Sequence, residues 1–135
     1  MADQGNLVPI YREISADLDT PVSAYLKVAR PPYSFLLESV EGGEHFGRFS
    51  FIGTEPRKII RTGPGQEYGG IDPLIPIEKE LSEINIVNIP EIQRFNGGAV
   101  GYLSYETVRY FEKLPSPEKV ATDVPESIFM FINLS

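Results

Sequence analysis

Two strand-like runs separated by a glycine-containing turn constrain the fold of this chain more than any other feature. Residues 34–40 read Ser-Phe-Leu-Leu-Glu-Ser-Val, and residues 47–53 read Gly-Arg-Phe-Ser-Phe-Ile-Gly. Such a pair predicts an antiparallel hairpin with a longer loop. Because side chains alternate between the two faces of a strand, Leu37 and Ser39 share one face and Glu38 lies on the other.

Glu38 is the unusual residue of this hairpin, because its strand neighbours on the same face are Leu36 and Val40. A carboxylate on an apolar face needs a partner, since an unpaired buried charge is too costly to keep. The partner is either an internal arginine such as Arg48 or the cation of a bound ligand. Glu38 and Ser39 can line one pocket only if the strand bulges or ends there.

The rest of the chain reads as short elements of both kinds. The runs Asp19-Thr20-Pro21 and Asp72-Pro73 are helix starts, and amphipathic stripes follow them to residues 29 and 84. Four more runs indicate strands, at residues 57–62, 84–89, 95–105 and 128–132. Residues 106–112 indicate a short helix or turn. We therefore predict an α+β fold over residues 1–135, an antiparallel β-sheet with a few short helices.

The last of these runs, Ile128-Phe129-Met130-Phe131-Ile132, is apolar on both faces of a strand. Such a strand belongs inside a sheet that is covered on both sides. If the chain acts alone, the alternative is an edge strand that pairs with a partner or a second copy. The first reading predicts that the sheet continues in sequence beyond this chain, which is then a fragment of a larger protein.

Composition excludes several classes of function. The chain has 12 basic and 19 acidic residues and a net charge of −7, so a phosphate backbone is repelled and nucleic acid is not an expected partner. There is no cysteine, which rules out disulfides and thiolate metal sites. No run has the length of a membrane span and no signal peptide is apparent, so we expect no membrane association and a cytoplasmic location.

No group of residues predicts catalysis in this chain. His45 is the only histidine and sits in a polar turn, so we expect it to be exposed rather than catalytic or metal-binding. We expect Tyr102 and Tyr105 to be core or interface residues, and Arg109 to form surface ion pairs with its helical neighbours Glu106 and Glu112. We predict no catalytic residue and no metal site.

Two long motifs carry a resemblance to a known family. The first is Leu36-Leu37-Glu38-Ser39 followed by GRFSFIG at residues 47–53, and the second is FNGGAVGYLSYETVRYFE at residues 95–112. With the helix start at Asp72, they resemble the N-terminal region of anthranilate synthase component I, the large subunit, from about Tyr11 to Met130. The enzyme that makes aminodeoxychorismate has a looser version of both motifs.

The resemblance implies a function for the hairpin. In this family the chorismate pocket and its magnesium-binding glutamates lie in a larger C-terminal part that this chain lacks, and a glutamine amidotransferase subunit supplies ammonia. The N-terminal region is associated with feedback inhibition by tryptophan. We therefore expect a regulatory segment of a two-part α/β sandwich enzyme, inactive alone, in which Leu37, Glu38 and Ser39 contribute to a tryptophan site. The alternatives are a non-catalytic interaction domain and the equivalent region of aminodeoxychorismate synthase.

Overall fold

The computed structural model describes residues 5–38, 49–87, 89–90, 97–115 and 124–132. These ranges contain two α-helices, one 3-10 helix and five strands: α1 (Pro21–Val28), β1 (Ser34–Glu38), β2 (Ser50–Thr54), β3 (Lys58–Thr62), α2 (Leu74–Ser82), β4 (Gly98–Leu103), η1 (Tyr105–Tyr110) and β5 (Ser127–Ile132). Both sheets are antiparallel, so the predicted α+β fold is confirmed.

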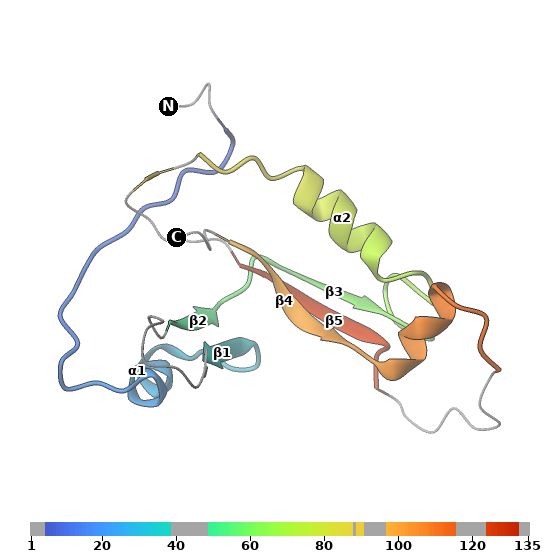
Figure 1. Cartoon of the computed structure of the whole chain (residues 1–135), viewed down its shortest axis with the longest axis horizontal. Coiled ribbons are helices and arrows are strands. Elements are labelled where there is room, and N and C mark those ends of the chain that lie inside the picture. Colours follow the sequence, from blue (N-terminus) through green and yellow to red (C-terminus); the bar gives the residue numbers. More distant parts are fainter. Residues whose placement is uncertain (1–4, 39–48, 88, 91–96, 116–123, 133–135) are drawn as a thin grey trace, which may run out of the picture.

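The first sheet is the predicted hairpin of β1 and β2, with Ser34 opposite Thr54 and Glu38 opposite Ser50. Helix α1 lies beside it at one end of the molecule (Figure 1). The helix starts where the sequence predicts: Thr20 caps it and exchanges hydrogen bonds with Ser23, and proline follows at the first helical position.

The second sheet has the strand order β3-β5-β4, so the apolar run of β5 is its central strand. This confirms that the run lies inside a sheet, and the alternative of an edge strand is wrong. Ser127 and Phe131 are fully buried, whereas Ile128 and Met130 on the other face are partly exposed. The prediction that this sheet is covered on both sides is therefore wrong for the described residues. Among them, α2 lies along one face of the sheet (Figure 1).

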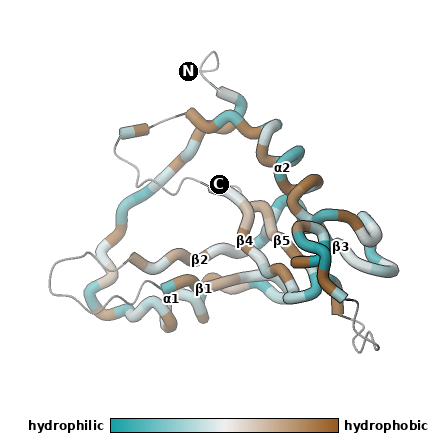
Figure 2. The backbone as a smooth tube through the Cα atoms, turned by 45° about the vertical axis from the view of Figure 1, so that its right-hand side comes forward, coloured by the Kyte–Doolittle hydropathy of each residue, from teal (hydrophilic) through white to brown (hydrophobic). Residues whose placement is uncertain are grey.

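The hydrophobic core lies between this sheet and α2. Its buried members are Ile60 of β3, Ile77 of α2 and Phe131 of β5, with Tyr68 and Phe129 packed around them. Hydrophobic and hydrophilic residues alternate along α2, as the amphipathic pattern predicts (Figure 2). The core is small: many large apolar side chains elsewhere, including Ile10, Leu18 and Leu26, are mostly exposed.

The run at residues 84–89 does not form the predicted strand in its described part. Ile86 forms a single parallel bridge with Leu7. Asn6 and Asn85 exchange hydrogen bonds, and the Val87 N–H donates to the Leu7 carbonyl at 2.8 Å. The N-terminal segment thus satisfies these backbone groups by local pairing, which hydrophobic alternation within residues 84–89 does not reveal.

An ion-paired cluster joins α2 to the sheet. The Glu80 carboxylate is largely buried and accepts from Lys58 Nζ at 2.5 Å, while Arg57 Nη2 lies 2.6 Å from its other oxygen. The hydrogen bond from Lys58, together with the charges of both cations, lowers the pKa of Glu80 below its usual value of 4.5. The same hydrogen bond raises the pKa of Lys58. Both pKa shifts favour the charged forms of Glu80 and Lys58.

We expect this cluster to make folding sensitive to acid. Because the folded pKa of Glu80 is below its unfolded value, its contribution is present above about pH 4.5 and is lost as the pH falls through the folded pKa. Glu80→Gln should lower the unfolding free energy at pH 7 by about 1–2 kcal/mol, since its partners stay partly exposed. Urea unfolding at pH 7 and at pH 3 measures both effects.

Glu78→Gln is the matched control, because Glu78 is exposed on the same helix. The control should keep the stability at pH 7 and the acid sensitivity of the unchanged chain. Glu80→Gln should differ from the unchanged chain much less at pH 3 than at pH 7. An equal difference at both pH values would contradict the role given to the Glu80 carboxylate.

Candidate functional site

Helix α1 covers one face of the hairpin and fixes its position. Tyr25 Oη and Ser34 Oγ form a hydrogen bond of 2.8 Å, and the Arg30 N–H donates to Thr54 Oγ1 at 3.0 Å. Ser34 and Thr54 are paired in the register, so both bonds lie on the same face. By alternation, Glu38 also lies on this face, at the end of β1 away from these contacts.

The opposite face of the hairpin is apolar. Leu37 is opposite Phe51, and Phe35 is opposite Gly53. The Phe35 ring occupies the space above Gly53, where a Cβ atom would come within 2.2 Å of it. Leu37 is 46% exposed, so part of this face is open to an additional group.

The structure places Leu37 and Glu38 at the end of β1, on different faces of the hairpin, as alternation predicts. Glu38 is exposed and has no ion pair among the described residues. Glu38 is open to solvent at the end of the two-stranded hairpin, so the expectation that it lies on a buried apolar face is wrong, and the choice between an internal arginine and a ligand cation as its partner stays open. Ser39, His45 and Arg48 lie outside the described residues, so the predictions for them stay predictions.

A polar cluster that the sequence does not predict surrounds Glu126, just before β5. Arg109 Nη2 lies 3.2 Å from one oxygen of its carboxylate, and Tyr110 Oη donates to the other at 2.8 Å. Burial and the hydrogen bond to Glu126 raise the pKa of Tyr110 to about 12, so this phenol is neutral at physiological pH. The cluster ties η1 to the start of β5.

The ion pair between Arg109 and Glu106 is confirmed at 3.3 Å. The second partner of Arg109 is Glu126 rather than the predicted Glu112. Local spacing could not reveal this pair, because residues 109 and 126 are far apart in sequence and meet only through the sheet. Tyr102 and Tyr105 are 39% and 84% exposed, so the core alternative is wrong for both, and the interface alternative stays a prediction.

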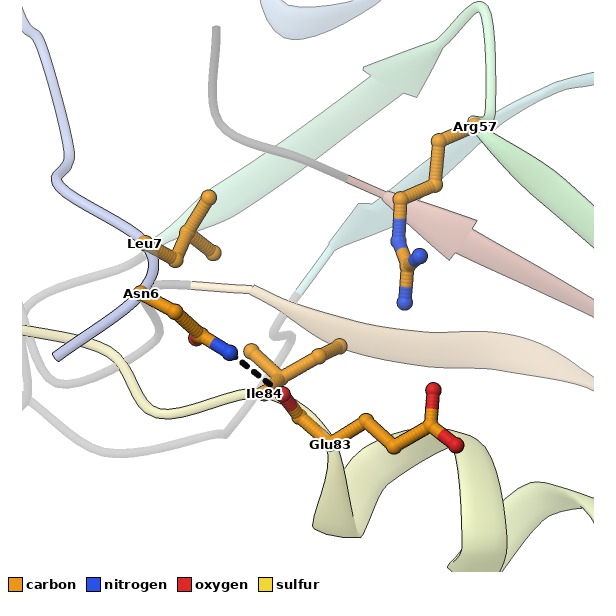
Figure 3. Close-up of a pocket in the computed structure, with 5 residues that line it drawn as sticks. All are labelled: Asn6, Leu7, Arg57, Glu83 and Ile84. Atoms are coloured by element: carbon orange, nitrogen blue, oxygen red, sulfur yellow. Dashed lines mark hydrogen bonds between the residues drawn. The ribbon is translucent and has the colours of Figure 1, made fainter.

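One pocket of about 230 Å³ lies where the N-terminal segment meets the end of α2 (Figure 3). Asn6 Nδ2 donates to the Glu83 carbonyl there at 2.6 Å, as Figure 3 shows. Arg57 faces this pocket, but it is ion-paired with Glu80 and lies over the Phe131 ring. The Asn6 amide and the Arg57 guanidinium of this pocket thus already have partners within the protein.

Among the described residues, no group of three or more histidine and acidic side chains could hold a metal ion. Within the same ranges, no helix is long and apolar enough to cross a membrane. Of the ligand site predicted from the sequence, the described residues include only the exposed end of β1.

No protein-family model matches the chain. Individual relatives do. The chain is 40% identical to anthranilate synthase component 1 of Synechocystis sp. over 146 residues, which cover 98% of the chain and 28% of that protein. It is 37% identical to the protein of that name from Pseudomonas aeruginosa, covering 99% of the chain and 31% of the relative.

A third relative, anthranilate synthase component 1 of Neisseria gonorrhoeae, is 46% identical over 123 residues, which cover 82% of the chain and 25% of the relative. The chain thus spans between a quarter and a third of the length of these curated relatives. The match nevertheless extends over nearly all of the chain, in agreement with the motifs of the hairpin and of residues 95–112. The chain belongs to the anthranilate synthase component 1 family and corresponds to one segment of the longer proteins in that family.

Proposed function

We propose that this chain is the N-terminal regulatory part of an anthranilate synthase component I and that the end of β1 contributes to its tryptophan site. The observation that supports the site most is the position of Glu38, an exposed carboxylate without an ion pair among the described residues. The ammonium group of an amino acid supplies the missing positive charge. Ser39 would complete this wall, and Leu37, half-exposed on the other face, would support the end of β1 from behind.

In this proposal the whole protein acts in tryptophan biosynthesis. It converts chorismate and ammonia to anthranilate and pyruvate, with magnesium bound in its other part and ammonia supplied by a glutamine amidotransferase subunit. This chain contributes no catalytic residue and is inactive alone. The relatives described above carry the anthranilate synthase name, which favours this branch over aminodeoxychorismate synthase.

Inhibition requires that tryptophan binds one arrangement of the whole protein more tightly than another. A ligand with equal affinity for both arrangements would not change their populations. The hairpin is suited to this role because its apolar face is partly open and can pack against a neighbouring part differently in the two arrangements. Tryptophan at the end of β1 would then stabilise the less active arrangement.

We expect Ser39→Ala to weaken tryptophan binding in a full-length protein that contains this segment. Loss of one hydrogen bond of about 0.5–1.5 kcal/mol corresponds to a roughly 2-fold to 12-fold lower affinity. Calorimetry measures the affinity, and anthranilate formation at increasing tryptophan concentration measures inhibition. Ser82→Ala, at the exposed end of α2, is the matched control. Unchanged affinity together with unchanged inhibition would remove Ser39 from the site.

A further inference from the structure

A second pocket, of about 340 Å³, lies at the junction between the hairpin and β3. Its lining comes from three places in the chain: the segment that joins α1 to β1, the connection from β2 to β3, and β3 itself. It is located near the start of β1, whereas the proposed tryptophan site is at the end of that strand. Four residue steps of β1 separate the two places by about 13 Å.

Two opposite charges face this pocket without neutralising each other. Arg30 and Glu55 both line it and both are exposed. Neither has an ion pair among the described residues, and the Arg30 side chain donates only a long hydrogen bond of 3.4 Å to the carbonyl of its neighbour Ala29. The pocket therefore offers one positive and one negative group to a ligand.

The backbone holds these two residues in fixed positions. The Arg30 N–H donates to Thr54 Oγ1 at 3.0 Å, which ties it to the residue before Glu55. Glu55 has a φ of 50°, the one positive value at a non-glycine residue in the described ranges. This left-handed conformation is unfavourable for a residue with a Cβ atom. Backbone strain of this kind is concentrated at functional sites, where the surroundings maintain it.

The remaining wall of the pocket is apolar and rigid. Its residues are three prolines, one aromatic ring and one isoleucine: Pro31, Pro32, Pro56, Tyr33 and Ile59. The Arg61 guanidinium lies 5.3 Å from the centre of the Tyr33 ring and donates a hydrogen bond to its hydroxyl group. Since the prolines and the held ring have little freedom to lose, an apolar group can bind here at a small entropic cost.

We propose that this pocket binds a free α-amino acid with an apolar side chain. The carboxylate would pair with Arg30, whose guanidinium suits a carboxylate in bidentate geometry. The ammonium group would pair with Glu55, and the side chain would pack against the prolines and the Tyr33 ring. The volume suits a small ligand. This inference does not rest on the regulatory role proposed above, because it uses neither Glu38 nor Ser39.

Three ligands that differ in charge test this assignment by NMR titration of the ¹⁵N-labelled chain: L-phenylalanine, phenethylamine without the carboxylate, and 3-phenylpropionate without the ammonium group. L-Phenylalanine should bind most tightly and shift the amide signals of Tyr33, Glu55 and Ile59. Arg30→Gln should lower the affinity for L-phenylalanine and for 3-phenylpropionate about 10-fold and leave the affinity for phenethylamine unchanged. Glu55→Gln should lower the affinity for L-phenylalanine and for phenethylamine and leave the affinity for 3-phenylpropionate unchanged.

Arg12→Gln and Glu67→Gln are the matched controls, since both residues are exposed and lie outside the pocket. They should bind all three ligands as the unchanged chain does. The amide spectrum of each variant shows independently that it is folded. Equal affinities for the three ligands, shifts confined to other residues, or no saturable shift up to about 10 mM L-phenylalanine would overturn the proposal.

Discussion

We expect Phe131→Ala to be among the most destabilising single substitutions in this chain. Phe131 is fully buried at the centre of the β3-β5-β4 sheet and packs with Ile60 and Ile77. Removing a buried phenylalanine side chain loses its transfer free energy and leaves a cavity, at a cost of about 3–5 kcal/mol. Typical domains have a total stability of about 5–15 kcal/mol, so this variant should retain only a small margin.

The matched control for Phe131→Ala is Phe111→Ala, because Phe111 at the end of η1 is 52% exposed. It should lower the unfolding free energy by less than about 1 kcal/mol, since half of its side chain already contacts water. Urea unfolding followed by circular dichroism measures both variants. Similar losses in the two variants would contradict the location of the core between α2 and the three-stranded sheet.

Regular periodicity made the local elements of this chain predictable. The hairpin, both α-helices and the central apolar strand follow from alternation, capping residues and amphipathic spacing, and the structure confirms them. The register also confirms that Leu37 and Glu38 face apart. These features depend on residues within a few positions of each other, where one sequence carries enough information.

Features that depend on distant parts of the chain were not predictable. The Glu126 partners of Arg109 and Tyr110 come together only when η1 and β5 are placed by the sheet. The same holds for the pairing of Asn6 with Asn85, which takes the place of the predicted strand in the described part of residues 84–89. The exposure of Glu38 was missed because its apolar strand neighbours indicate a buried face, whereas a two-stranded hairpin leaves its end open.

The second prediction with a large expected effect concerns the charge of Glu38 at the end of β1. In a full-length protein that contains this segment, Glu38→Gln should weaken tryptophan binding by about 10-fold to 100-fold, since a charged hydrogen bond contributes about 1.5–3 kcal/mol. Glutamine keeps the size of the side chain and removes only its charge. Indole-3-propionate, which lacks the ammonium group, should bind the unchanged protein and the Glu38→Gln variant equally.

Glu83→Gln, an exposed acidic position at the end of α2, serves as the control and should leave the affinity for both ligands unchanged. Anthranilate formation without tryptophan should be the same in all three proteins, because our proposal gives Glu38 no part in the chemistry. The most direct measurement is calorimetry with tryptophan on the unchanged protein and on Glu38→Gln. A selective loss of tryptophan affinity is the predicted result, and an affinity equal to that of the unchanged protein would contradict a tryptophan site at the end of β1.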